Sequence, residues 1–274
     1  MTGQRPLALV TGAGGGIGAG VSRMLERRGY DVIAVDLTAP IVDRVTATLG
    51  PGSIGVVSDA ADPEAVSALA ARIRGEWAER LEVIVCNAGL ISTDEVADAA
   101  PADLRDQLAV MLDSPVQLIA AAASVMAARG RGRILATVSM GGILALPGSA
   151  VYSAAKAGLR AFLTALSAEM RGTGVTVTGI YPSGVDTAML RHEARDGGSM
   201  LNFVGRIFTV DDVVRAYERA MSSRRLEIYL PFADSIGARA LAFAPQLGNR
   251  LLPLLDRLGR RGHRAYLARI DGGS

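Results

Sequence analysis

A tyrosine and a lysine four positions apart could carry acid–base chemistry. Tyr152 and Lys156 stand at i and i+4 of a helix-like stretch, so both side chains project from one helix face. A free tyrosine has a pKa of about 10, too high for an effective base at neutral pH. A nearby ammonium favours the phenolate and lowers that pKa. The pair could therefore move the proton in an alcohol–carbonyl interconversion, although such spacing also occurs by chance on solvated helices.

A second functional pattern is the glycine-rich run at residues 11–18, which reads TGAGGGIG. It links a strand-like segment at 7–11 to a helix-like segment at 17–28. Glycine lets the backbone approach a ligand closely, and a helix N-terminus offers N–H groups and a positive dipole end to a pyrophosphate. Two registers of a dinucleotide fingerprint fit, one starting at Gly12 and one at Gly14. Both stay open, and an ordinary flexible turn is the alternative.

Asp36 bears on which dinucleotide would bind. It ends the second strand-like segment, 18 residues after Gly18. A carboxylate there can accept hydrogen bonds from an adenosine ribose and repels a 2′-phosphate. The glycine run contains no Arg or Lys to offset that repulsion, and none directly follows Asp36. The sequence therefore predicts NAD rather than NADP, with a solvated carboxylate at the strand end as the alternative.

Strand-like and helix-like segments alternate along the chain. We predict helices at 17–28, after Asp62-Pro63, and at 101–129, 151–171 and 211–222, and strands at 7–11, 32–35, 54–58, 83–86, 133–138, 175–181 and 227–230. Continuous apolar strands alternating with helices indicate a parallel sheet covered on both faces. Right-handed crossovers then give an α/β fold, a single-domain doubly wound (Rossmann) sheet of about seven strands.

Composition limits the function classes. Hydrophobic residues make up 50% of the chain and charged residues 20%, which indicates a globular protein. A net charge of +2 gives no reason to expect a nucleic-acid partner. Cys86 is the one cysteine, so neither a disulfide within the chain nor a cysteine metal cluster can form, and no metal site is predicted. We see no secretory signal or membrane span, and expect a soluble cytoplasmic protein.

These patterns together resemble the short-chain dehydrogenase/reductase family. The glycine run matches its TGxxxGIG cofactor motif, and Tyr152 with Lys156 matches its YxxxK motif. Asn87-Ala88-Gly89 follows the fourth predicted strand, as does the family's sheet-stabilising motif. Ser139 ends the fifth, 13 residues before Tyr152, which is the family's spacing for its catalytic serine. The resemblance covers roughly residues 5–232.

The resemblance implies roles for these residues. Tyr152 would be the general acid/base, Lys156 would lower its pKa and hold the nicotinamide ribose, and Ser139 would bind the substrate oxygen. Hydride would pass between the substrate carbon and the nicotinamide ring. The implied cofactor contacts are Gly12, Gly14, Gly15, Gly16, Ile17, Gly18, Asp36, Leu37, Asp59, Ala60, Asn87, Ala88, Gly89, Val110, Tyr152, Lys156, Pro182, Gly184, Val185 and Thr187. Family members are commonly homodimers or homotetramers that pair their fourth and fifth crossover helices.

Two positions depart from the family's pattern. Where the family has Val-Asn-Leu in the fourth crossover helix, this chain has Val110-Met111-Leu112. That Asn normally holds a water of the proton relay, so here the backbone or another group carries the relay, or turnover is slower. Ser183 replaces a usual glycine, and we expect a modest effect because serine is small.

The remaining segments concern the substrate. By resemblance, residues at about 188–208 form the substrate lid, and its Met, Leu and Phe content favours a medium or large hydrophobic alcohol or ketone, or only the packing of a short helix. We divide the chain into a catalytic domain at 1–235 and a helical extension at 236–274. The extension is basic and amphipathic, with breaks expected at Pro245 and Pro253. We favour packing on the domain over membrane-surface contact.

Two functions remain in view. The first is an NAD(H)-dependent oxidoreductase that interconverts a secondary alcohol and a ketone or aldehyde, with a small molecule as its substrate. The second is a dinucleotide-binding regulatory or scaffold protein with little turnover, which Met111 keeps open. The presence of Ser139, Tyr152 and Lys156 together favours the enzyme.

Overall fold

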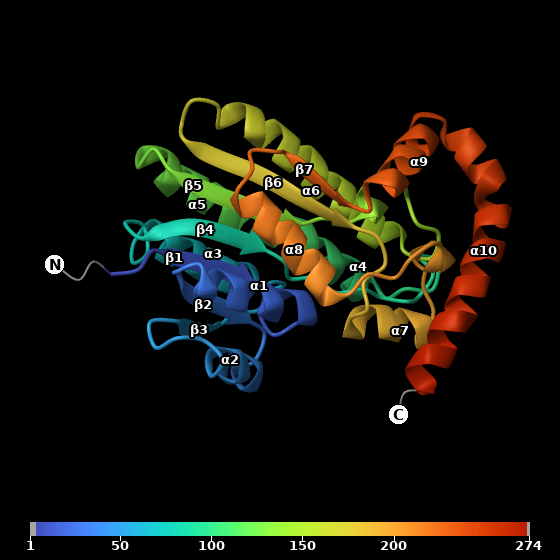
Figure 1. Cartoon of the computed structure of the whole chain (residues 1–274), viewed down its shortest axis with the longest axis horizontal. Coiled ribbons are helices and arrows are strands. Elements are labelled where there is room, and N and C mark those ends of the chain that lie inside the picture. Colours follow the sequence, from blue (N-terminus) through green and yellow to red (C-terminus); the bar gives the residue numbers. More distant parts are fainter. Residues whose placement is uncertain (1–3, 273–274) are drawn as a thin grey trace.

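A parallel sheet with helices on both faces forms the body of the protein (Figure 1). The computed structural model describes residues 4–272 and contains one seven-stranded sheet in the order β3-β2-β1-β4-β5-β6-β7. Its strands are β1 (Leu7–Thr11), β2 (Asp31–Asp36), β3 (Ile54–Val57), β4 (Leu81–Cys86), β5 (Gly132–Thr137), β6 (Val175–Pro182) and β7 (Glu227–Leu230). The strand order reverses between β1 and β4, which is where a doubly wound sheet opens a ligand crevice. The predicted fold class is confirmed.

Each face of the sheet has its own hydrophobic core. The helices α1 (Gly16–Arg27), α2 (Ala39–Thr46) and α8 (Val210–Met221) pack on one face. The other face is covered by α3 (Pro63–Arg74), α5 (Ser114–Ala128) and α6 (Ala150–Glu169). Alternate residues of β1 divide between the two cores: Leu7 and Leu9 face α3 and α5, whereas Ala8 and Val10 face α1 and α8. Both faces being buried explains the unbroken apolar strands of the sequence.

The predicted helix at 101–129 has an irregular centre. The helix α4 (Pro101–Leu108) passes into a π-helical turn, η1 (Ala109–Asp113), before α5 continues. The stretch Pro101–Ala128 is long and apolar enough to cross a membrane by length and composition alone, but half of its most apolar 18-residue window is buried in the fold. Because core helices of globular proteins pass the same test, it is weak evidence for a membrane span.

The C-terminal extension consists of two helices, α9 (Phe232–Phe243) and α10 (Pro245–Asp271). The chain breaks before Pro245 as predicted, but the expected break at Pro253 is wrong, because α10 continues through it. A helical proline removes one hydrogen bond, and contacts farther along the helix stabilise α10. Gly259 and Gly262 pack so closely that a Cβ would lie 2.1 and 2.0 Å from the carbonyl oxygens of Met200 and Phe203. The predicted end points at residues 1 and 274 lie outside the described residues.

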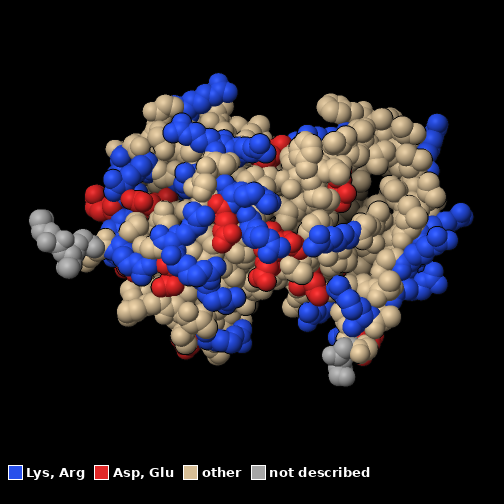
Figure 2. Space-filling model, viewed as in Figure 1, with Lys and Arg blue, Asp and Glu red and all other residues tan. Residues whose placement is uncertain are grey.

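The extension packs on the substrate lid, in line with the favoured interpretation. The lid contains α7 (Ala188–Asp196) and the 3-10 turn η3 (Met200–Phe203). Tyr266 of α10 is buried with Leu190 and Phe203 of the lid. Basic side chains follow the outer side of α10 (Figure 2).

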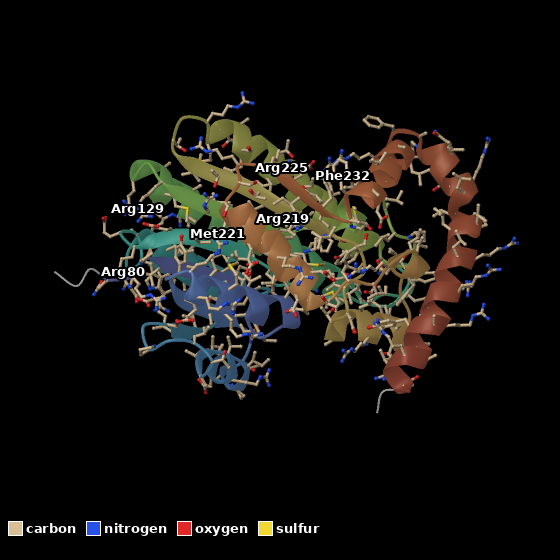
Figure 3. All side chains as sticks on the ribbon, viewed as in Figure 1. Arg80, Arg129, Arg219, Met221, Arg225 and Phe232 are labelled. Atoms are coloured by element: carbon tan, nitrogen blue, oxygen red, sulfur yellow. The ribbon has the colours of Figure 1, made fainter. Side chains whose placement is uncertain are left out.

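Long side chains stabilise the sheet at its end opposite the lid, as Figure 3 shows for Arg80 and Arg129. Arg80 pairs with Asp31 at 2.8 Å, and Arg129 donates to the carbonyl oxygens of Glu79 and Leu81. At the free edge beside β7, Arg219, Arg225 and Phe232 surround a shallow hollow (Figure 3). These groups lie away from the glycine loop and from the Tyr–Lys pair.

Candidate active site

A cavity of about 600 Å³ opens at the carboxyl ends of the central strands. Parallel strands bring their carboxyl ends to one edge, so segments far apart in sequence meet there. Ser139, Tyr152 and Lys156 line this cavity. The predicted cofactor residues in its wall are Gly12, Gly15, Gly16, Ile17, Asp36, Leu37, Asp59, Ala60, Asn87, Ala88, Gly89, Val110, Pro182, Gly184, Val185 and Thr187. Gly14 and Gly18 lie behind the wall.

The glycine loop owes its shape to close backbone contacts. Gly12 adopts a φ of +62°, and a Cβ on it would lie 2.8 Å from the Cα of Ala88. A Cβ on Gly18 would lie 2.0 Å from the carbonyl oxygen of Gly12, so only glycine lets α1 start this close to the loop. Gly14 and Gly18 therefore shape the loop from behind.

The N-terminus of α1 is open to a ligand. Its N-cap, Gly15, offers no side-chain acceptor, and its first turn contains no acidic residue. By contrast, Asp62 caps α3 and Thr187 caps α7 through their side chains. The first N–H groups of a helix have no partner within the helix. The uncapped start of α1 at the cavity wall thus fits the diphosphate of a dinucleotide.

Asp36 stands at the far end of this wall. Its Oδ2 accepts from the Gly14 N–H and its Oδ1 from the Leu37 N–H, both at 2.8 Å. The carboxylate is thus fixed by the loop and still lines the cavity. Among the described residues of the wall, Lys156 is the one cation. No positive side chain of the wall accompanies Asp36.

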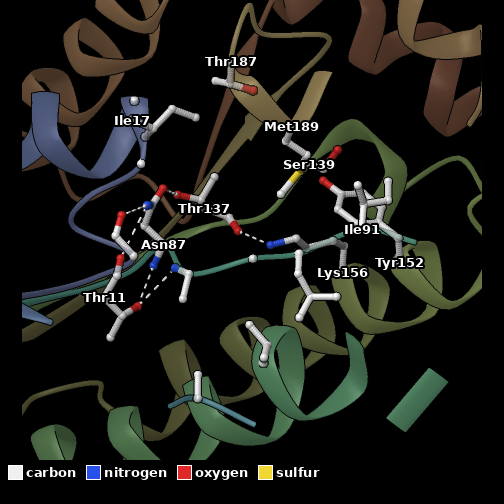
Figure 4. Close-up of a pocket in the computed structure, with 18 of the residues that line it drawn as sticks. Thr11, Ile17, Asn87, Ile91, Thr137, Ser139, Tyr152, Lys156, Thr187 and Met189 are labelled. Atoms are coloured by element: carbon white, nitrogen blue, oxygen red, sulfur yellow. Dashed lines mark hydrogen bonds between the residues drawn. The ribbon is translucent and has the colours of Figure 1, made fainter. Parts of the chain in front are cut away.

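Asn87 joins three strand ends. Its Nδ2 donates to the Gly12 carbonyl oxygen at 3.2 Å, and its Oδ1 accepts from the Thr137 hydroxyl at 2.8 Å (Figure 4). The backbone N–H groups of Asn87 and Ala88 donate to the Thr11 hydroxyl at 3.0 and 3.1 Å. This network ties β1, β4 and β5 together below the glycine loop. It agrees with the stabilising role that the resemblance implies for this motif.

Ser139, Tyr152 and Lys156 meet on one side of the cavity (Figure 4). The Lys156 Nζ donates to the Thr137 carbonyl oxygen at 2.9 Å and lies 5.7 Å from the centre of the Tyr152 ring. Ser139 begins a 3-10 turn, η2 (Met140–Gly142), where its Oγ accepts from the Gly141 N–H at 3.0 Å. That bond orients the Ser139 hydroxyl oxygen at the mouth of β5.

The protonation of the pair differs from the expectation of a lowered tyrosine pKa. Burial raises the pKa of Tyr152 to about 12, an effect that Ser139 opposes and Glu193 strengthens. Burial also lowers the pKa of Lys156 to about 8. Desolvation disfavours both charged forms, and here it outweighs the attraction between ammonium and phenolate. At neutral pH Tyr152 therefore carries its proton, as a proton donor requires.

Met111 occupies the π-helical turn and is fully buried. It packs with Val110 and Ala155, and its Sδ would lie 3.7 Å from a Cβ on Gly89. The Ser114 N–H, which an α-helix would give to the Val110 carbonyl, donates to Ala109 instead. The next backbone nitrogen belongs to Pro115, which has no hydrogen. The carbonyl of Val110, a cavity residue, is thereby left without a helical donor.

The substrate side of the cavity contains residues that the sequence did not single out as site residues. Ile91 follows β4, Met189 and Glu193 belong to α7, and Asn202 belongs to η3. Figure 4 shows Ile91 and Met189 beside Ser139 and Tyr152. No motif marks these positions, because only the folding of the lid brings them over the strand ends. Ser183 also lines the cavity and donates to Asp234 of α9 at 3.1 Å.

Asp186 connects the cofactor loop to the C-terminal extension. It lies between Val185 and Thr187 and accepts a hydrogen bond from the Tyr266 hydroxyl at 2.7 Å. Arg191 and Arg269 also pair with it, at 2.9 and 3.3 Å. Burial opposes its ionisation, but the bonds from Tyr266 and Arg191 hold the pKa of Asp186 below its ordinary value. The carboxylate thus fixes this loop to α10.

Comparisons with known proteins agree with this architecture. Residues 6–197 match the short chain dehydrogenase family. The chain is 31% identical to the 3-oxoacyl-(acyl-carrier-protein) reductase FabG of Escherichia coli over 185 residues, which is 68% of this chain and 75% of FabG. It is 33% identical to an uncharacterized oxidoreductase of Myxococcus xanthus over 257 residues, 93% of this chain and 96% of that protein.

A solved structure extends the likeness to three dimensions. A short-chain dehydrogenase from Sphingobium yanoikuyae in complex with NADPH gives a TM-score of 0.77 at 24% identity, covering 88% of this chain and 94% of that one, which supports the fold. The chain belongs to the short-chain dehydrogenase/reductase family. It is accordingly an oxidoreductase of the class that acts on CH–OH groups and binds a nicotinamide dinucleotide.

Proposed function

We propose that this chain is an NAD(H)-dependent oxidoreductase that interconverts a secondary alcohol and a ketone, or a primary alcohol and an aldehyde, on a medium-to-large substrate. The observation that carries this proposal is that Ser139, Tyr152 and Lys156 share one cavity with the uncapped start of α1. The apolar side chains of Ile91, Met189 and Leu190 in that cavity favour a largely hydrophobic substrate.

The residues of this cavity divide the work of the reaction. The start of α1 holds the diphosphate, Lys156 the nicotinamide ribose, and Val185 with Thr187 the carboxamide. The bound nicotinamide supplies or accepts the hydride. The Ser139 hydroxyl donates a hydrogen bond to the carbonyl oxygen of the substrate. The protonated Tyr152 hydroxyl donates its proton to that oxygen during reduction and takes it back during oxidation.

The route by which Tyr152 recovers its proton uses the backbone in this proposal. The side chain of Met111 is a poor hydrogen-bonding group and is packed away among apolar neighbours. The carbonyl of Val110 has no helical donor and belongs to a residue in the cavity wall. It can accept a hydrogen bond from a water on the way from Lys156 to solvent. Of the alternatives left open by the sequence, this one needs no missing side chain.

The preference for NAD follows from charge. The Asp36 carboxylate lines the cavity where the adenosine ribose binds in this family, and the one cation among the described wall residues is Lys156, which belongs to the reacting end. A 2′-phosphate would meet Asp36 without a compensating positive side chain. NADPH in the Sphingobium relative is a property of that protein, and the Asp36 argument is decided by comparing affinities for NADH and NADPH.

An NAD(H)-linked screen across alcohols, ketones and aldehydes tests the proposal, with Tyr152→Phe as the control variant. We expect Tyr152→Phe to lower kcat by about 10³-fold, because the phenyl ring keeps the packing and loses the transferable proton. NADH binding, followed by fluorescence, should persist in the variant. Turnover that is unchanged in Tyr152→Phe would refute the assigned mechanism.

The second candidate, a dinucleotide-binding regulatory or scaffold protein, draws on Met111. The same screen separates the two functions. NADH binding without turnover of any compound would favour the scaffold, whereas turnover that depends on Tyr152 would favour the enzyme.

We further propose that the protein works in the cytoplasm as a homodimer or homotetramer, paired through α4–α5 and α6. Light scattering coupled to size exclusion reports the assembly. A monomer at micromolar concentration would contradict the proposed assembly, and fractionation of cells tests the location.

A further inference from the structure

A buried carboxyl group on the substrate side has no role in the reaction described above. Glu193 is 4% exposed, although glutamate is almost never fully buried without a partner. It lies on α7, one turn after Met189, and both residues line the cavity. Its charge is felt at the Tyr152 hydroxyl, whose pKa it helps to raise. Glu193 therefore lies close to the reacting group as well as under the lid.

The protein satisfies only half of this carboxyl group. The Asn202 Nδ2 donates to Glu193 Oε1 at 2.8 Å. Within residues 4–272, Oε2 receives no hydrogen bond, and Glu193 forms no ion pair. Burial raises the pKa of Glu193 to about 7, and the bond from Asn202 opposes that rise. A buried polar group that lacks a partner is costly unless a ligand completes it.

The surroundings of Glu193 hold the carboxyl in one position. A Cβ on Gly198 would lie 3.0 Å from Oε1, and the φ of +136° at Gly198 suits glycine. The charged residues that neighbour Glu193 on its helix point away from it, since Arg191 pairs with Asp186 and His192 pairs with Asp196. Mere packing of a lid helix would be served better by leucine at this position, as at Leu190.

We propose that Glu193 selects substrates that carry a second hydroxyl group, which donates a hydrogen bond to its free oxygen while the first oxygen meets Ser139 and Tyr152. The substrate class is then hydroxy ketones and the matching diols, with an otherwise apolar frame. A site built to bind a hydroxyl discriminates strongly against the analogue that lacks it, because the buried acceptor is left without a partner. This inference rests on the proposed oxidoreductase function and adds the substrate class.

The test compares cyclohexanone with its 2-, 3- and 4-hydroxy derivatives, so that the spacing between the two oxygens is itself measured. We expect one isomer to be preferred in kcat/KM over cyclohexanone. Glu193→Leu should lower that ratio by about 10- to 100-fold, and Glu193→Gln, which keeps the shape and an acceptor, should restore part of it. Asp196→Asn removes an acidic charge from the exposed side of the same helix and should leave the ratio at the wild-type value.

Binding measurements keep this inference separate from the proposed reaction. Calorimetry measures the affinity of the NAD⁺-loaded protein for the cyclohexanediols and for cyclohexanol, with and without Glu193→Leu. Tighter binding of a diol that depends on Glu193, without turnover, would support the selective site and overturn the oxidoreductase proposal. Turnover or binding with no preference for a second hydroxyl, or with a preference that survives Glu193→Leu, would overturn the inference alone.

Discussion

The two walls of the cavity are built in different ways. The cofactor wall uses backbone groups at the ends of β1, β2 and β4, where Gly12 and Gly18 allow contacts that a Cβ would prevent. The substrate wall uses side chains of α7 and η3, which α10 holds in place from more than sixty residues away through the bond from Tyr266 to Asp186. The cofactor wall is therefore short-range and intolerant of added atoms, whereas the substrate wall depends on long-range contacts and can change its specificity.

The largest effect should come from adding one carbon to the cofactor wall. In Gly18→Ala the new Cβ would approach the Gly12 carbonyl oxygen to 2.0 Å unless the loop moves. Overpacking of this kind costs about 1–3 kcal/mol, so we expect NADH binding to weaken by up to roughly 100-fold. Gly237→Ala on α9, where a Cβ meets nothing within 4 Å, is the matched control and should bind NADH as the wild type does. Equal affinities in both variants would contradict the close-packing argument.

Lys156 lies where the two walls meet, and its titration should affect stability. Its pKa is lowered by burial from 10.5 to about 8, so between these values the unfolded chain binds a proton that the folded chain has lost. The stability of the wild type relative to Lys156→Met should therefore rise as the pH increases from 8 to 10.5, by on the order of 2–3 kcal/mol. Urea unfolding at both ends of this window measures the difference. A difference that falls with pH would mean that the ammonium is stabilised in the fold.

The same titration should appear in catalysis. As the pH rises above about 8, Lys156 loses the charge that holds the ribose, and kcat/KM should decline. Tyr152, with its raised pKa of about 12, stays protonated in that range and does not cause the decline.

A smaller effect should separate charge from shape in the cofactor wall. Asp36→Asn keeps an acceptor for the Gly14 N–H and removes the charge that repels a 2′-phosphate. We expect the ratio of NADH affinity to NADPH affinity to fall by about 10-fold, measured by fluorescence titration. Asp43→Asn on the exposed side of α2 controls for net charge. A ratio that stays constant would show that Asp36 does not select the cofactor.

The smallest effect should come from the brace on the substrate wall. Tyr266→Phe keeps the packing on Phe203 and removes the hydroxyl that donates to Asp186. Loss of this bond should lower the free energy of unfolding by about 1 kcal/mol and raise the KM for the hydroxy ketone by about threefold. Arg261→Ala, on the exposed side of α10, should change neither value. If Tyr266→Phe weakened NADH binding as strongly as Gly18→Ala, the distinction between the two walls would fail.

Motifs with short spacing could be interpreted from the sequence because their chemistry is local. The glycine run, Asp36 and the Tyr152–Lys156 pair each depend on a strand end or a helix turn, and the parallel sheet then brings them to one edge. Gly14 and Gly18 were predicted as cofactor contacts and lie behind the wall instead, since spacing cannot distinguish a residue that touches a ligand from one that shapes the loop.

The sequence by itself determined the class of fold, the family and the residues that meet the reacting atoms, because strand–helix alternation and local motifs constrain them directly. The tertiary structure alone decided the protonation of Tyr152 and Lys156, since burial depends on every element around them. It also decided that α10 passes through Pro253 and braces Asp186, and that Glu193 lies under the lid with one oxygen unpaired. These features arise from contacts between distant segments, which no local pattern records.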